Sequence, residues 1–363
     1  MQIKQPDSIV FITVIFLMLL SSMDTYLDGL RYVKYITPVV VILYWVTRRR
    51  FELYPSNESK PFIFLILISV LLSFRGNEYG LQDIVFMVSG VAPFVLVKNR
   101  KINVSNVFYV TILFFIIITL PIVLKNGVSV SFINSKSTLE NHTFGFLFGL
   151  FCCYFFCVKD KKMFFIALLF SILTLKRISI IAVILVVAAS YLPIITRVLT
   201  KPYFMVFLNG LYVFIAFFIT TALFNDLCVE YIGLGASYIT MGRDILYGGL
   251  FEEMDLSVLY LLGGVGIGES YSVAAHAIEF EGKYNLHSDV LKIYFELGAL
   301  AFVTFFWLLY KERNGVLMAL YLNIVLFTDN VSTYSIVLFY YLMLAEQMRL
   351  NGFGEFFNKD KNA

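Results

Sequence analysis

Four polar side chains stand close together in an otherwise apolar stretch of the chain. The segment YNLHSDVLKIYFELGAL, residues 284–300, carries His287, Asp289, Lys292 and Glu296. The last three recur at helical spacing, so they lie on one face of a predicted helix. Lys292 can pair with either acid along that face, which offsets the cost of placing charge inside a membrane. The spacing predicts a structural stripe that faces the protein interior.

His287 precedes this stripe, where the predicted helix begins. An imidazole titrates near neutral pH, and it is the usual choice of general base for a hydroxyl group. We therefore predict that His287 is a catalytic residue. The alternative is an interfacial histidine that is hydrogen-bonded and inert.

Two adjacent basic residues, Lys176 and Arg177, lie between two apolar segments that only about two residues separate. The first segment, 163–175, gives roughly 20 Å of helix, against a hydrocarbon core of about 30 Å. Both basic residues are therefore expected below the outer surface, in a cavity that opens outward. A forked guanidinium suits phosphate, so Arg177, with Lys176 as helper, is a candidate diphosphate ligand. The alternative is that both side chains snorkel to the interface.

A third basic residue, Arg243, lies in the long segment 225–286. That segment contains many acids and only two bases, Arg243 and Lys283. One hypothesis is that Arg243 is a second diphosphate ligand that folds down toward Arg177. The other is an ordinary ion pair with an acid of the loop, Asp244 or Glu252.

The composition indicates a membrane protein. Of 363 residues, 60% are hydrophobic and 15% are charged, whereas soluble domains have about 45–50% apolar and 25% charged residues. The net charge of +3 and the lack of a basic polar domain give no reason to expect a nucleic-acid partner. The 3 histidines do not form an HxxxH pair and no DxD motif is present, so neither a metal site nor a cofactor is predicted.

Apolar segments separated by polar breaks predict about twelve membrane-spanning helices. Their approximate cores are 9–20, 33–47, 61–74, 84–97, 107–124, 144–158, 163–175, 178–195, 203–224, 290–310, 316–328 and 331–344. The predicted fold class is all-α, a polytopic integral membrane protein that forms a single domain over residues 1–363.

Lysine and arginine are concentrated in alternate breaks between these segments, and such breaks face the cytoplasm. This bias predicts that both termini are cytoplasmic. It places the large loop 225–286, between the ninth and tenth spans, on the opposite, outer side. The apolar and aromatic residues of this loop predict a small helical cap that rests on the membrane face.

These features resemble the superfamily of O-antigen polymerases and O-antigen ligases, in topology over the whole chain and in motifs over about 40 positions. The matching residues are His287, Ser288, Glu296 and Gly298, with Arg177 at a short turn between central spans and Arg243 after Gly242 in the large loop. The ligase branch usually surrounds its first arginine with small residues. Here the context is LTLKRIS, and this difference favours the polymerase branch.

The resemblance implies a metal-independent glycosyltransferase of the bacterial inner membrane. It would transfer the growing glycan from undecaprenyl diphosphate to a hydroxyl of the next lipid-linked repeat unit, at the periplasmic face of the bilayer. His287 would deprotonate that hydroxyl, while Arg177 and Arg243, with Lys176, would neutralise the diphosphate leaving group. A chain-length regulator protein is a possible partner.

Three other functions are open at this point. An O-antigen ligase would use the same donor. A flippase or transporter of the lipid-linked oligosaccharide would need polar residues through the full membrane thickness, and segments 107–124, 178–195 and 203–224 contain no charged residue. A structural scaffold would leave Arg177 and the short segment before it without an explanation.

Overall fold

The computed structural model describes residues 5–22, 28–48, 57–127, 129–131, 136–137, 139, 141–199, 201–254, 257–311 and 315–352. Within these ranges the chain is helical except for turns and one short antiparallel hairpin of β1 (Val130–Ser131) and β2 (Lys136–Ser137). The predicted all-α fold class is confirmed.

The first half of the chain forms nine α-helices and three 3-10 helices within the described ranges. The α-helices are α1 (Gln5–Ser21), α2 (Ile36–Arg48), α3 (Lys60–Leu71), α4 (Glu78–Val91), α5 (Val104–Asn126), α6 (His142–Cys157), α7 (Lys161–Leu173), α8 (Arg177–Tyr191) and α9 (Pro193–Leu199). The 3-10 helices are η1 (Asp28–Tyr35), η2 (Ser73–Arg75) and η3 (Ala92–Leu96).

Short polar side chains begin several of these helices. Asn77 accepts hydrogen bonds from the N–H groups of Tyr79 and Gly80 at the start of α4. Asn141 and Asp160 cap α6 and α7 in the same way. Such caps satisfy N–H groups that have no partner within the helix.

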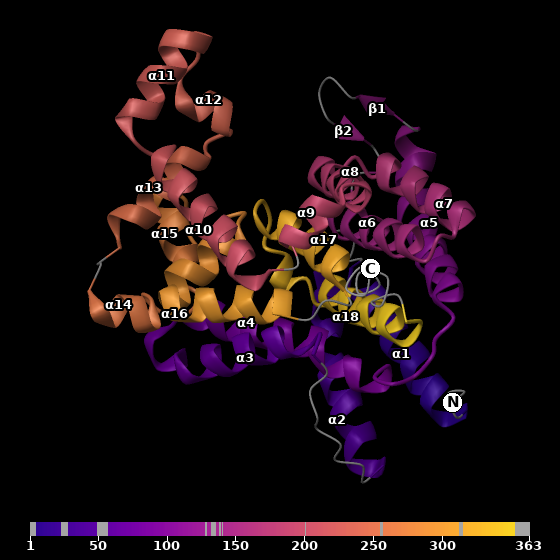
Figure 1. The fold of residues 1–363 in the computed structure, drawn as a ribbon. Coiled ribbons are helices and arrows are strands. Elements are labelled where there is room, and N and C mark those ends of the chain that lie inside the picture. The colour runs from indigo at the N-terminus through magenta and orange to yellow at the C-terminus, as the bar shows by residue number, and fades with distance from the viewer. Residues whose placement is uncertain are drawn as a thin grey trace.

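The second half begins with α10 (Pro202–Phe218) and continues through five shorter helices. These are α11 (Ala222–Ile232), α12 (Ala236–Thr240), α13 (Arg243–Glu252), α14 (Val258–Gly263) and α15 (Glu269–Ala277). The chain ends with α16 (Asp289–Lys311), α17 (Val316–Leu326), η4 (Val331–Thr333) and α18 (Ser335–Leu350). Segment 225–286 is thus largely helical, and its first part, α11 and α12, projects away from the other helices (Figure 1).

Several helices have the apolar character of membrane spans. Among the described residues, three are long and apolar enough to cross a bilayer: Glu78–Leu96, Val104–Asn126 and Asp289–Lys311. A fourth is possible if α10 and α11, which are bent by 78° relative to each other, form one span. Each of the twelve predicted apolar cores overlaps a helix, but 178–195 is divided between α8 and α9 and 203–224 between α10 and α11, and helix length does not establish twelve spans. The two chain ends, predicted to be cytoplasmic, lie outside the described residues.

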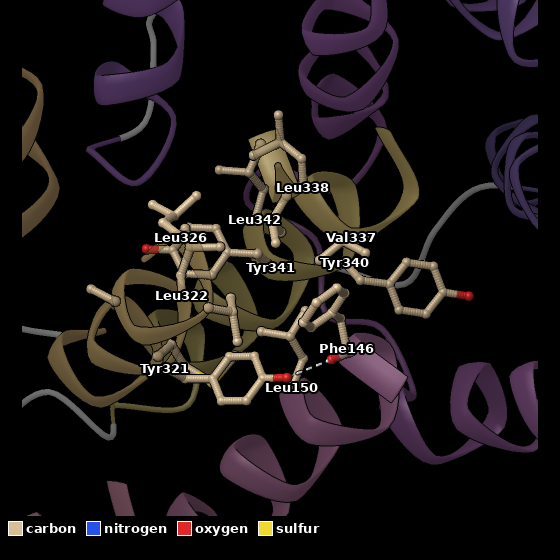
Figure 2. Packing of buried hydrophobic residues seen from close by; sticks show 14 of the residues in the cluster. Phe146, Leu150, Tyr321, Leu322, Leu326, Val337, Leu338, Tyr340, Tyr341 and Leu342 are labelled. Carbon is tan, nitrogen blue, oxygen red and sulfur yellow. Dashed lines mark hydrogen bonds between the residues drawn. The ribbon is translucent and has the colours of Figure 1, made fainter. Parts of the chain in front are cut away.

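The most deeply buried region is where α6 packs against α17 and α18 (Figure 2). The Tyr321 hydroxyl donates to the Phe146 carbonyl at 3.0 Å and lies 2.8 Å from Ser179 Oγ. Gly149 leaves room for this phenol, because a Cβ there would lie 2.2 Å from the Tyr321 oxygen. A buried tyrosine thus keeps hydrogen-bond partners, as it must in an apolar core.

Helix α16 is broken at Gly298, where φ is 83° and ψ is 173°. The break exposes carbonyl groups that a regular helix would use. The Phe295 carbonyl accepts from the Val265 N–H at 3.0 Å, and the Glu296 carbonyl accepts from the Gly266 N–H at 3.2 Å. A non-helical backbone inside an apolar environment requires such partners from elsewhere in the protein.

The glycine-rich segment 263–268 can supply these donors because Gly264 and Gly266, on either side of Val265, let its backbone approach its neighbours closely. A Cβ at Gly264 would lie 2.4 Å from the Glu296 backbone, and a Cβ at Gly266 would lie 1.9 Å from the Arg75 carbonyl oxygen. Only glycine fits between α16 and the start of α4. This contact fixes the first turns of α16, which carry the polar stripe.

Candidate functional site

The start of α16 is held in a specific local geometry. Ser288 precedes the helix, and its Oγ accepts from the Leu291 N–H at 3.3 Å. His287 has a φ of 57°, in the left-handed region that few residues other than glycine adopt. Its half-buried ring packs edge-on against Tyr284, with centroids 6.2 Å apart. Unusual backbone geometry of this kind is concentrated at functional sites.

The two acids of the α16 stripe accept hydrogen bonds from serines of other elements. Asp289 accepts from the Ser332 N–H at 2.7 Å and from its hydroxyl at 2.8 Å, at η4. Glu296 accepts from the Ser270 hydroxyl at 2.5 Å and from its N–H at 3.3 Å, at the start of α15. Both carboxylates are buried. The stripe therefore connects α16 to two neighbouring elements.

Lys292 of the stripe forms an ion pair with Asp83 of α4. Its Nζ also lies 2.8 Å from the Tyr271 hydroxyl, and that hydroxyl donates to Asp83 at 2.8 Å. The predicted pairing of Lys292 with Asp289 and Glu296 along its own helix is thus corrected. The two acids have closer donors, while Asp83 brings a carboxylate to the lysine from a distant part of the chain.

A small cavity of about 30 Å³ lies beside this pair, with Glu296 and Ser332 also in its lining. Its size suits one water molecule. Lys283 lies at the edge of the cluster, with its Nζ 3.9 Å from the centroid of the Tyr271 ring. Burial lowers the pKa of Lys283. The cluster is a closely packed polar junction of α4, α15 and α16.

Lys176 and Arg177 differ in their surroundings. The Lys176 ammonium forms an ion pair with Asp329 at 2.6 Å, and the Asp329 carboxylate also accepts from the Tyr334 hydroxyl at 3.2 Å. Arg177 is exposed at the first position of α8, and none of the described residues forms a hydrogen bond or ion pair with its guanidinium. The turn before it includes Leu175, with φ of 47°.

Arg243 is half-buried at the first position of α13. The structure does not have the alternative ion pair of Arg243 with Asp244. The Asp244 carboxylate instead accepts from Ser237 at 2.5 Å and from Thr240 at 2.6 Å. The Arg243 charge acts on Tyr247, where it opposes the burial that raises the pKa of that phenol. Arg243 and Tyr247 are four residues apart on α13, so both side chains lie on one face of that helix.

Tyr212 of α10 connects these parts of the site. Its hydroxyl donates to the Phe327 carbonyl at 2.5 Å, and it lies 3.3 Å from Ser288 Oγ and 3.4 Å from Tyr247 Oη. The Arg243 charge acts on Tyr212 as well. One hydroxyl group thus joins α10, α13, the start of α16 and the end of α17.

The network brings together regions that the sequence analysis identified separately. Arg243 precedes Tyr247 by one helical turn on α13, Ser288 stands next to His287, and Phe327 is two residues before Asp329. The Asp329 carbonyl accepts from the Asp289 N–H at 3.3 Å, and the Asp329 carboxylate holds Lys176. Arg177 adjoins this network through Lys176 alone.

Sequence reasoning did not identify Tyr212, Tyr247 or Asp329. Among 23 tyrosines, nothing in the pattern distinguishes the two that share a hydrogen bond. Asp329 had a visible signal, since it is a carboxylate in an apolar stretch near the end of the chain. Asn330 beside it is buried, and neither atom of its amide has a hydrogen-bond partner among the described residues.

In chemical terms, the network joins the residue next to the His287 imidazole to the helix that carries the Arg243 guanidinium, which no described carboxylate neutralises. Arg177, by contrast, is exposed and joined to the network only through Lys176. These groups can bind an anion and accept a proton. Within the described ranges, no three His, Cys, Asp or Glu side chains are grouped as metal ligands would be. Comparison of the chain with known protein families, with curated proteins and with solved structures found no match.

Proposed function

We propose that this protein is an O-antigen polymerase of the bacterial inner membrane. It has about twelve spans, and its large loop 225–286 lies on the periplasmic side. It transfers the growing glycan from undecaprenyl diphosphate to a hydroxyl of the next lipid-linked repeat unit. The observation that supports this proposal is the hydrogen-bond network of Tyr212. It links Tyr247, which follows Arg243 by one helical turn, to the residue next to His287 and to Phe327, two residues before the Asp329 that pairs with Lys176.

In this reaction, a bond forms between the acceptor oxygen and the anomeric carbon of the donor sugar, while the bond from that carbon to the diphosphate oxygen breaks. The His287 imidazole takes the proton of the acceptor hydroxyl. The diphosphate leaves with the bonding electron pair. Arg177 and Arg243 stabilise the negative charge that develops on its oxygens, and forked guanidinium groups suit phosphate.

Lys176 has a different role in the proposal from that of the two arginines. Its ion pair with Asp329 offsets most of its charge, so it contributes little to binding an anion. It holds the start of α8 against the turn between α17 and α18, and thereby sets the position of Arg177. The diphosphate is then bound mainly by the two arginines.

A gel of surface lipopolysaccharide tests the proposed function. A strain that lacks the gene is complemented with the wild type, with His287→Ala, or with His276→Ala, which changes an exposed histidine of α15. We expect the lipopolysaccharide of the deletion strain to consist of core capped by one repeat. Complementation with the wild type or with His276→Ala should restore a full ladder, whereas complementation with His287→Ala should not. Immunoblots of membranes check that the variants are equally abundant.

Other gel patterns would support other functions. Bare core with accumulated lipid-linked polymer indicates a ligase. Bare core with unpolymerised lipid-linked repeats retained on the cytoplasmic side indicates a flippase. A full ladder from His287→Ala would make His287 an inert interfacial residue.

A further inference from the structure

The Tyr212–Tyr247 pair is the only contact among the described residues in which side-chain hydroxyls of α10 and α13 meet. Tyr212 has one phenolic proton, and the Phe327 carbonyl, at 2.5 Å, is its nearest acceptor. Tyr247 must then donate to Tyr212 if the 3.4 Å contact is a hydrogen bond. The pair therefore has a direction, from α13 through α10 to the end of α17.

The pair determines where Arg243 lies. Tyr247 follows Arg243 by four residues on α13, so both side chains lie on the same face of that helix. No described carboxylate forms an ion pair with Arg243, and on this side of α13 the Tyr247 hydroxyl meets the Tyr212 hydroxyl at 3.4 Å. Tyr247 thus sets the rotation of α13 about its axis and leaves the guanidinium charge available to an anion.

The same pair determines the position of His287. Tyr212 contacts the Ser288 hydroxyl at 3.3 Å, and Ser288 caps α16 through the Leu291 N–H. His287 is bonded directly to Ser288 and has the left-handed backbone described above. A shift of Tyr212 would therefore change the direction in which the imidazole leaves the start of α16.

We propose that Tyr212 and Tyr247 are positioning residues that hold the Arg243 guanidinium and the His287 imidazole in the relative placement that the glycosyl transfer requires. This inference rests on the proposed function. The ligand that they serve is the diphosphate of the lipid-linked donor, together with the acceptor hydroxyl. Their hydroxyl groups are what matter, because phenylalanine at either position would keep the packing, including the Tyr212 ring against Phe327 at 4.4 Å between centroids.

The test is a double-mutant cycle on the purified full-length protein in lipid nanodiscs, with undecaprenyl-diphosphate-linked repeat unit as the only substrate. Tyr212→Phe and Arg243→Ala are made singly and together. We expect Tyr212→Phe to lower kcat about tenfold, which corresponds to one misplaced charge-stabilising contact, with little change in KM. In the Arg243→Ala background the same change should lower kcat by clearly less than tenfold, because only the part of its effect that passes through His287 remains.

Tyr340→Phe is the matched control. Tyr340 is also buried, its hydroxyl lies 3.0 Å from Thr111 Oγ1, and it belongs to α18, away from the network. Its loss should leave kcat unchanged and lower the thermal unfolding midpoint about as much as Tyr212→Phe does. If the double variant does not fold, the kcat of Tyr247→Phe is compared with that of Tyr340→Phe instead.

Two results would overturn the inference. In one, the effects of Tyr212→Phe and Arg243→Ala multiply fully, so that the phenol acts independently of the arginine. In the other, Tyr212→Phe and Tyr340→Phe have the same kcat. If the wild type itself does not polymerise the lipid-linked repeat unit, then the proposed function fails, and this inference fails with it.

Discussion

Two polar regions at opposite ends of α18 differ in how their charges are satisfied. At the C-terminal end, the buried Glu346 carboxylate accepts from the Asn99 N–H and from Arg349, both at 2.7 Å. Gln347 accepts from the Ile102 N–H at 2.9 Å and donates to the Arg100 carbonyl at 2.8 Å. These side chains bind the backbone of the irregular turn before α5, so their role is structural.

At the N-terminal end of α18, the buried acids are equally well satisfied and Lys176 is paired with Asp329, but the two arginines of the candidate site are not paired with any described carboxylate. Asp289 and Asp329 have close donors. Arg177 and Arg243, however, have no carboxylate partner among the described residues. Burial of charge is therefore common to both ends, and what distinguishes the candidate site is cationic groups that are available to an anion.

The largest expected effect tests this difference with one arginine from each end. Arg243→Ala should lower polymerisation by roughly 10²–10³-fold, because it removes a group that stabilises charge in the transition state. Arg349→Ala should leave the rate per folded molecule unchanged, since Arg349 is paired with Glu346 at 2.7 Å. The measurement is kcat in nanodiscs for both variants. Equal losses in the two variants would mean that the contrast between the ends has no functional meaning.

The next effect concerns stability at the junction of α4 and α16. Lys292→Ala should destabilise the protein by about 3–5 kcal/mol, because it leaves Asp83 as an unpaired buried charge. A double variant, Asp83→Leu with Lys292→Met, should recover most of this loss, since it removes both charges and keeps the volume. Thermal unfolding in detergent measures both. If the single variant is as stable as the wild type, the ion pair is not important for folding.

A smaller effect is expected where α16 breaks. Gly298→Ala should destabilise by about 1–3 kcal/mol, because alanine is strained at positive φ. Its Cβ would also lie 2.6 Å from the Tyr260 carbonyl oxygen. Gly315→Ala is the control, since the nearest atom to a Cβ there is 3.8 Å away. Similar unfolding midpoints for the two variants would show that the break in α16 is not required.

The smallest effect on stability should have the opposite sign. Asn330→Leu should stabilise the protein by about 1–2 kcal/mol, because it removes a buried amide whose donor and acceptor are both unsatisfied. If the amide serves the site, the same variant should polymerise more slowly than the wild type. Unfolding midpoint and kcat are measured on one preparation. If the variant is less stable than the wild type, the buried amide of Asn330 has hydrogen-bond partners after all.

Much of the helical architecture was predictable from the sequence. Each of the twelve apolar segments overlaps a helix, because apolar runs with few charges favour helix in a membrane and polar breaks end them, although 178–195 and 203–224 are each divided between two helices. Local caps at Asn77, Asn141 and Asp160 are likewise visible as short polar residues before apolar runs. The number of helices that cross a bilayer was not predictable, because several apolar helices are shorter than a bilayer core and α10 and α11 meet at 78°.

The candidate site was predictable only residue by residue. His287, Arg243 and Arg177 stand out because ionisable groups are rare in this chain, and rarity is a property of the sequence. The tyrosine pair does not stand out, since its role depends on a contact between α10 and α13 rather than on residue type.

By itself, the sequence determined that the chain is helical, that it is apolar enough for a membrane, and which few residues carry charge within apolar segments. The tertiary structure alone decided the partners of those charges. Lys292 pairs with Asp83, 209 residues away, rather than with the acids of its own helix. The physical reason is that a buried charge requires its closest available partner, and which groups are close is settled by the packing of helices that are distant in the chain.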